Sequence, residues 1–115
     1  MKKLIFFCML IFNIQSYSQT VFTNKTSLIN TSTNVILETK VEITQFIFDS
    51  NYVIFNYNGK VTVYNVLFIS TKDNITTYQT LNSEKNIIYF HLNDVNVGMN
   101  DGINTFIIIY EIYLK

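Results

Sequence analysis

The fold is decided by residues 52–64, whose sequence is YVIFNYNGKVTVY. In the middle of this stretch, Asn58 and Gly59 separate two runs of β-branched and aromatic residues, a composition that favours strands. A type I′ turn needs a positive φ at both central residues, and the pair Asn-Gly adopts this conformation more readily than other pairs. The stretch therefore predicts a two-residue β-hairpin in which Tyr57 lies opposite Lys60.

This register sorts the side chains of the hairpin onto two faces, because successive residues of a strand point in opposite directions. The preceding run, residues 35–48, also has an aliphatic face and an aromatic face. Each matches the corresponding face of the hairpin only if the connection to Tyr52 holds an even number of loop residues, since a slip of one residue turns every side chain over. We predict a two-residue turn at Ser50-Asn51 or a loop of about four residues.

The two predicted faces differ in the kind of side chain they carry. The aliphatic face is expected to be the main core, and its members are Val41, Ile43, Ile47, Tyr52, Ile54, Val61, Val63, Leu67 and Ile69. The opposite face mixes charged residues with the aromatic residues Phe46, Phe48, Phe55, Tyr57, Tyr64 and Phe68.

The rest of the chain continues as strand-like runs with short polar turns, and short connections join antiparallel neighbours. These strands are predicted at 35–48, 52–57, 60–70, 75–81, 87–92 and 103–114. The predicted fold class is all-β: an antiparallel meander of about six to seven strands over residues 35–115, forming a small barrel or a two-layer sandwich. A polar lead-in over residues 19–34 precedes it, with at most a short strand at 21–23. The last run is apolar on both faces, so we expect it to be central or to close the sheet against an early strand.

Residues 1–18 have the pattern of a cleaved signal peptide. Lys2 and Lys3 form a basic start, residues 4–14 form an apolar run broken only by Asn13, and small residues precede Gln19. The run is too short for a membrane anchor, which needs about twenty residues. We therefore expect an exported protein, periplasmic or extracellular, and the signal looks bacterial.

Cys8 is the only cysteine, and it belongs to the signal. A lipoprotein is not expected, because the bulky Phe6 and Phe7 precede Cys8 where small residues would be needed. The exported chain would hold no disulfide.

Charge and length exclude two classes of function. Removal of the signal leaves 115 − 18 = 97 residues with six lysines, eight acids and no arginine, a formal net charge of 6 − 8 = −2. Nucleic-acid binding needs a basic face, so we do not expect it. An integral membrane protein is not expected either, because eight spanning strands of roughly ten residues with their loops would exceed this length.

The residues that carry chemistry are sparse. His91 is the only histidine, whereas a zinc site takes three or four nitrogen or sulfur ligands. The carboxylates Asp49, Asp73, Asp94 and Asp101 all fall in predicted turns, which aspartate side chains favour for structural reasons. We expect no enzyme and no cofactor; a small hydrolase that uses His91, or Asp94 with Asp101, remains a third alternative.

Residues 93–102 concentrate oxygen donors. Asp94, Asn96 and Gly98 stand at every second position and are followed by Asn100 and Asp101, which resembles the spacing of calcium loops, but Met99 stands where the turn glycine should be. We expect a flexible connection here and treat these four residues as weak calcium candidates.

The aromatic face is the remaining candidate site. Aromatic side chains on an exposed sheet can stack on sugars, apolar ligands or a partner's side chains, because they offer a large rigid area at little cost in entropy. Alternatively, other parts of the chain cover them and they form a second half of the core. The leading hypothesis is a noncatalytic binding role for a protein partner or an apolar or sugar ligand; the alternative is a structural or assembly subunit that associates through sheet edges.

Overall fold

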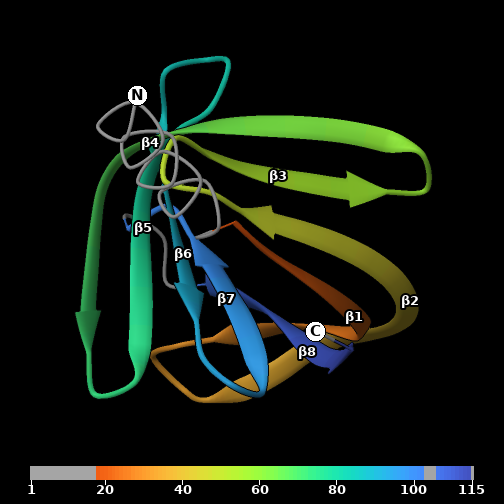
Figure 1. Ribbon diagram of the computed structural model, residues 1–115. Helices are drawn as coiled ribbons and strands as arrows, with labels where there is room; N and C mark the ends of the chain where they lie inside the picture. Colours follow the sequence, from red (N-terminus) through yellow and green to blue (C-terminus); the bar gives the residue numbers. More distant parts are fainter. Residues whose placement is uncertain (1–17, 103–105, 115) are drawn as a thin grey trace, which may run out of the picture.

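A computed structural model of the protein describes residues 18–102 and 106–114. In this part of the chain eight antiparallel strands follow one another and close into a barrel (Figure 1). The strands are β1 (Gln19–Asn30), β2 (Val35–Phe48), β3 (Tyr52–Tyr57), β4 (Lys60–Lys72), β5 (Ile75–Leu81), β6 (Ile87–Leu92), β7 (Asn96–Asn100) and β8 (Phe106–Leu114). The predicted all-β meander is confirmed, and it forms a barrel rather than a sandwich. None of the described residues belongs to a helix long and apolar enough to cross a membrane.

The predicted hairpin around Asn58 and Gly59 is confirmed. The two residues have φ angles of 54° and 80°, as a type I′ turn requires. Tyr57 pairs with Lys60, and the register continues to the pairing of Val53 with Tyr64.

The predicted turn between β2 and β3 is also confirmed, in its two-residue form. The backbone N–H of Asp49 donates a hydrogen bond of 2.8 Å to the carbonyl oxygen of Tyr52, which leaves only Ser50 and Asn51 in the turn. The aliphatic sets of β2, β3 and β4 therefore share one face, with Ile54 opposite both Ile47 and Val63.

The prediction that this aliphatic face is the main core is wrong. Val41 and Ile43 are 88% and 65% exposed, whereas Phe46 and Phe48 on the opposite face are completely buried. The aromatic face is the inside of the barrel because the sheet curves around it and closes. An eight-stranded barrel leaves an interior that side chains can fill, and large rings fill it efficiently. The buried residues that line it are Val21, Phe46, Phe48, Val53, Tyr78, Phe90, Leu92, Val97 and Tyr110.

Phe68 was predicted on the same face as Phe46, but it lies outside and is 61% exposed. The cause is an irregularity in the pairing of β4 with β5 between Val66 and Phe68. Val66 pairs with the buried Thr80, while Phe68 pairs with Gln79. One extra residue at this point, Leu67, turns the following side chains over, as a β-bulge does.

Two segments predicted to be largely irregular, the first with at most a short strand at 21–23, are full strands. Residues 19–30 of the predicted polar lead-in form β1, which pairs with β2 along its length and with β8 to close the barrel. Residues 96–100 of the predicted flexible connection form β7, between β6 and β8. The pairing of β8 with β1 confirms the expectation that the last run closes the sheet. The predicted signal peptide, apart from Ser18, lies outside the described residues, as do residues 103–105 of the predicted last strand.

Three fully buried threonine side chains inside the barrel are hydrogen-bonded. The hydroxyl groups of Thr23 and Thr44, both buried and opposite each other on β1 and β2, form a hydrogen bond. The buried Thr80 hydroxyl donates to the carbonyl oxygen of Ile88 at 2.9 Å. These bonds offset the cost of burying hydroxyl groups among apolar side chains.

Candidate functional site

A series of aromatic rings leads from the middle of the barrel to one of its ends. The ring of Phe46 lies 4.8 Å from that of Phe55 and 4.9 Å from that of Tyr110, both edge to face. Phe55 in turn lies 6.5 Å from Tyr57, the last residue of β3. Burial decreases along this series, from the fully buried Phe46 to Tyr57, which is 43% exposed.

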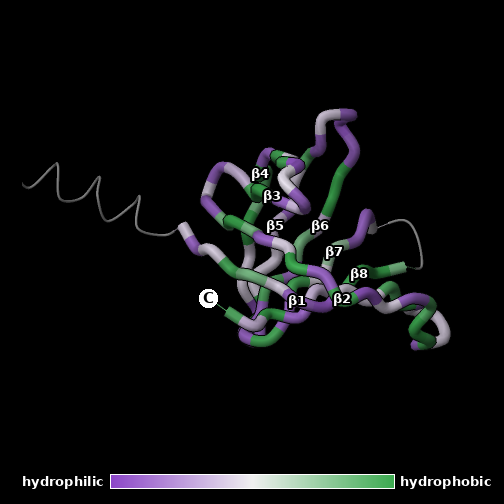
Figure 2. The backbone as a smooth tube through the Cα atoms, turned by 90° about the vertical axis from the view of Figure 1, so that its right-hand side faces the viewer, coloured by the Kyte–Doolittle hydropathy of each residue, from purple (hydrophilic) through white to green (hydrophobic). Residues whose placement is uncertain are grey.

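The barrel interior opens at this end because β2 is longer than β3. The pairing of β2 with β3 begins at Thr44, opposite Tyr57, so residues 35–43 of β2 extend beyond the end of β3. In Figure 2 the hairpin that joins β1 to β2 projects from the rest of the barrel. The inner side of this extension therefore forms one wall of a cavity whose opposite wall is β3.

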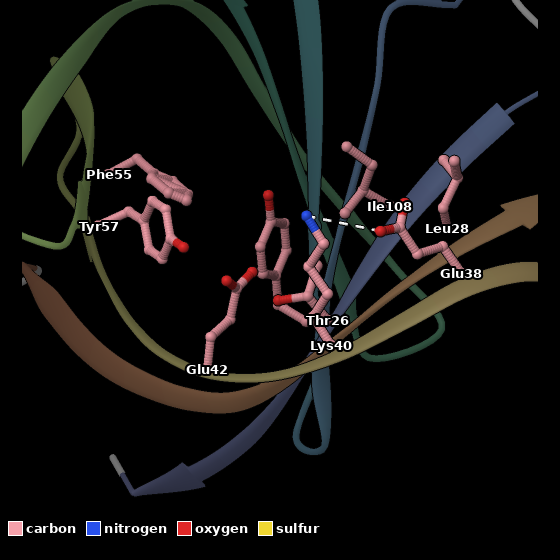
Figure 3. Close-up of a pocket in the computed structure, with 9 residues that line it drawn as sticks. Thr26, Leu28, Glu38, Lys40, Glu42, Phe55, Tyr57 and Ile108 are labelled. Atoms are coloured by element: carbon pink, nitrogen blue, oxygen red, sulfur yellow. Dashed lines mark ion pairs between the residues drawn. The ribbon is translucent and has the colours of Figure 1, made fainter.

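The cavity has a volume of about 290 Å³. Its lining residues come from β1, β2, β3 and β8, and they are Thr26, Leu28, Glu38, Lys40, Glu42, Phe55, Tyr57, Ile108 and Tyr110. A second cavity of about 240 Å³ shares Leu28 and Ile108 with the first. Phe55 and Tyr57 project from one side toward Glu42, Lys40 and Thr26 on the other (Figure 3).

Three charged side chains from alternate positions of β2 enter the cavity. The ammonium nitrogen of Lys40 lies 3.5 Å from a carboxylate oxygen of Glu38. Glu42 lies on the side of Tyr57 (Figure 3), and hydrogen bonding to its carboxylate is the largest cause of the raised pKa of Tyr57. Lys40 is thus paired with Glu38, while Glu42 faces Tyr57 (Figure 3).

The tyrosine hydroxyl groups at the cavity are held in their neutral form. The hydrogen bond to Glu42 and the charge of that carboxylate raise the pKa of Tyr57, against a smaller opposing effect of Lys40. Burial raises the pKa of Tyr110, with further contributions from Tyr64 and from Glu42. The negative charge of Glu42 thus contributes to the raised pKa of tyrosine hydroxyl groups on two walls of the cavity.

One polar atom in the cavity wall is not satisfied. The side-chain oxygen of Thr26 is buried and has no hydrogen-bond partner within the described part of the chain. Buried polar groups are nearly always hydrogen-bonded in folded proteins, so each exception needs a reason. A bound molecule that reaches this hydroxyl group would supply the missing partner.

The structure separates the six aromatic residues that the sequence places on one face. Phe46 and Phe48 are buried in the core, and half-buried Tyr64 packs edge to face against Phe90 at 4.9 Å. Phe55 and Tyr57 line the cavity. Phe68 lies on the outer surface.

Sequence analysis did not single out the other residues of the cavity. The aromatic face of β2 continues toward the start of the strand with three charged residues, Glu38, Lys40 and Glu42, and Val41 lies on the other face. Because side chains alternate along a strand, the sequence already placed these charged residues on the same face as Phe46. Tyr110 alternates in the same way with its neighbours in β8 but stands in a run of isoleucines, where the alternation is hidden. The cavity residues of β1 could not be recognised in the sequence, because that segment is rich in Ser, Thr and Asn and shows no clear alternation of apolar and polar side chains.

The four weak calcium candidates do not converge. Asn96 and Asn100 stand at the two ends of β7, about 13 Å apart at the rise of an extended strand. The Asn96 amide oxygen accepts a hydrogen bond from the Asn93 side chain at 3.0 Å. Asp94 and Asp101 lie just outside the two ends of β7. One ion could not be reached by side chains from both ends of this strand.

His91 lies on β6, pointing away from the aromatic core, and both of its ring nitrogens have neighbours. Nδ1 lies 3.1 Å from the Thr77 hydroxyl oxygen and Nε2 lies 3.4 Å from the Asn100 side-chain oxygen. The ring stacks on Tyr89 with a centroid distance of 6.4 Å. These contacts give His91 a structural role in the cross-strand packing of β5, β6 and β7.

Comparisons with protein-family models, with curated proteins and with solved structures give no match. The geometry of the cavity is therefore the basis on which a function can be inferred.

Proposed function

We propose that this chain is an exported, noncatalytic binding protein, and that its ligand is a small molecule held at the open end of the barrel. The observation that carries the proposal is the convergence of Phe55, Tyr57 and Tyr110 with the polar groups of β2 on one cavity. Ligand sites in proteins are concave and mostly apolar, with a few polar groups that orient the ligand. The signal-like residues 1–18 are the support for export.

The size of the cavity limits the ligand. A volume of about 290 Å³ lies at the lower end of the range for small-molecule sites, about 300 to 1,000 Å³. The barrel below the cavity is filled by Phe46 and its neighbours, so a ligand cannot reach deeper without displacing them. The apolar part of the ligand would contact the rings, and its polar part would face the charged side chains of β2.

The proposal is tested with three compounds of one shape and different charge: choline, its neutral isostere 3,3-dimethylbutan-1-ol, and the anion 3,3-dimethylbutanoate. Each is titrated at millimolar concentrations into the isotopically labelled protein while the NMR signals of Phe55, Tyr57 and Tyr110 are recorded. We expect at least one compound to shift these signals in a saturable way. If none of the three does so, the proposed function is wrong.

Two variants show whether a response comes from the cavity. Leu28→Trp places a large side chain in the cavity wall and should abolish the response. Val41→Trp adds the same side chain on the outer face of the neighbouring strand, where Val41 is 88% exposed, and should leave the response intact. A response that survives Leu28→Trp unchanged would place binding elsewhere and contradict the proposal.

A second candidate function, an assembly subunit, is favoured by the outer surface of β2, β3 and β4. Aliphatic side chains form a row across these strands, from Ile47 through Ile54 to Val63, and Val41 and Ile43 are exposed beside it. Over residues 41–47, 52–56 and 61–67, the amide residues at outward positions are Gln45, Asn56 and Asn65, and no outward position in these three ranges is charged. An exposed apolar face without charge suits association with a second copy of the chain.

Sedimentation velocity over a range of protein concentrations tests this candidate. Association through the outer face predicts a sedimentation coefficient that rises with concentration and an Ile43→Lys variant that stays monomeric. Val95→Lys adds the same charge at an exposed position between β6 and β7 and should associate as the unchanged protein does. A sedimentation coefficient that does not change with concentration would exclude the candidate.

A further inference from the structure

The cavity at the open end of the barrel carries more negative than positive charge. It contains the carboxylates of Glu38 and Glu42 and the ammonium group of Lys40, a formal net charge of 1 − 2 = −1. The charge of Lys40 is balanced by Glu38 at 3.5 Å. The excess charge therefore belongs to Glu42, which lies beside the aromatic wall (Figure 3).

Glu42 still has capacity to bind. An ionised carboxylate can accept about four hydrogen bonds, whereas the hydroxyl group of Tyr57 can donate only one. The raised pKa values of Tyr57 and Tyr110 keep both hydroxyl groups neutral at pH 7, so neither adds a charge of its own.

The rings beside Glu42 favour the same kind of ligand. The faces of aromatic rings carry partial negative charge and attract cations, and protein sites for quaternary ammonium ions are lined by several such rings. Phe55 packs edge to face against Tyr110 at 5.5 Å and against Tyr57 at 6.5 Å, and all three rings line the cavity.

From this arrangement we infer that the ligand of the cavity is a small organic cation, with an ammonium group that contacts Glu42 and the rings of Phe55, Tyr57 and Tyr110. The inference rests on the proposed function and names the class of its ligand. Lys40 opposes such a ligand, and its pairing with Glu38 reduces that opposition. An anion would be repelled by Glu42, and the cationic residue that lines the cavity, Lys40, is already paired with Glu38.

The three isosteric probes also test this inference. We expect choline to bind about tenfold more tightly than 3,3-dimethylbutan-1-ol, because a cation gains both the ring and the carboxylate interaction. The anion 3,3-dimethylbutanoate should bind more weakly than the neutral alcohol. Dissociation constants come from the same NMR titrations of the labelled protein.

Two charge variants separate this inference from a general effect of net charge. Glu42→Gln should remove most of the preference for choline, whereas Glu111→Gln, which changes the net charge equally outside the cavity, should leave the preference unchanged. Lys40→Gln should tighten choline binding severalfold, because Glu38 becomes available to the cation. Lys25→Gln is its matched control, since Lys25 is paired with Glu111 at 3.4 Å and does not line the cavity.

The outcomes distinguish the two proposals. If the neutral alcohol or the anion binds in the cavity as tightly as choline, the inference about the cation is wrong while the proposed binding function stands. If no probe shifts the signals of the cavity residues, the binding function itself fails. If Glu42→Gln keeps the full preference for choline in a folded protein, Glu42 is not the cation-binding group and the inference is overturned.

Discussion

The inner and outer faces of β2, β3 and β4 are both rich in apolar side chains, but they differ in what those side chains do. Inside, Phe46 contacts the rings of Phe48, Phe55, Phe90 and Tyr110 and is completely buried. Outside, aliphatic residues pair across the strands and remain in contact with solvent. The apolar character of a residue therefore does not identify the core of this protein.

The shape of the sheet, and not the apolar character of its residues, determines which of its two faces becomes the core. A closed barrel has only one interior, and all eight strands contribute to it. The outer face can be covered only by something outside the barrel. Exposed apolar residues are common on protein surfaces, so the aliphatic outer face is compatible with a folded monomer as well as with association.

The sharpest test of this comparison exchanges one residue from each face for alanine. Phe46→Ala should lower the free energy of unfolding by about 3–5 kcal/mol, because it opens a cavity among packed rings. Ile43→Ala, on the outer face of the same strand, should change it by less than about 0.5 kcal/mol. Urea unfolding followed by circular dichroism measures both values. Equal losses at the two positions would mean that the outer face is covered in solution.

A smaller effect is expected from the two pairs of threonines. Thr44→Val leaves the buried hydroxyl group of Thr23 without a partner and should cost about 1–3 kcal/mol of unfolding free energy. The double variant Thr23→Val, Thr44→Val should recover most of this loss. Thr71→Val breaks a comparable hydrogen bond, of 3.1 Å, between the hydroxyl groups of Thr71 and Thr76. Because this hydrogen bond is exposed to solvent, the substitution should change the free energy of unfolding only slightly. The expectation fails if Thr71→Val costs as much as Thr44→Val.

The smallest effect is expected at alkaline pH. Burial raises the pKa of Tyr110 above that of an unfolded tyrosine, so the folded state holds this proton more tightly. The resulting stabilisation is fully present below about pH 10, the pKa of an unfolded tyrosine, and is lost progressively as the pH rises further. The unfolding free energy of Tyr110→Phe, compared with its own value at pH 8, should therefore fall less steeply above pH 10 than that of the unchanged protein. Parallel curves would contradict a buried, neutral Tyr110.

Much of the local structure could be predicted from the sequence because it depends on neighbours along the chain. The turn at Asn58-Gly59 needs two residues that accept a positive φ, and the register of β3 with β4 follows from it. The turn at Ser50-Asn51 follows from the requirement that like faces match. The strand β1 escaped prediction because most of its residues are polar and its structure depends on pairing with the distant β8. The strand β7 escaped prediction because it is short and lies among Asn, Asp and Gly residues.

The candidate site could be predicted only in part. The alternation of residues put the rings and the charged residues of β2 on one face, which is the face that lines the cavity. Sequence could not show that Tyr110 completes this cavity, because Tyr110 and Phe55 are far apart along the chain and meet only when the barrel closes. Nor could it show the bulge at Leu67, which removes Phe68 from the interior.

The sequence by itself determined the class of the fold, the two central turns, and which side chains share a face, because each depends on backbone preferences and on the alternation of side chains along a strand. Only the tertiary structure decided which face is the interior and where the cavity opens. The physical reason is that closure of the barrel by β8 and β1 is a long-range contact, and the burial of either face is a consequence of that contact.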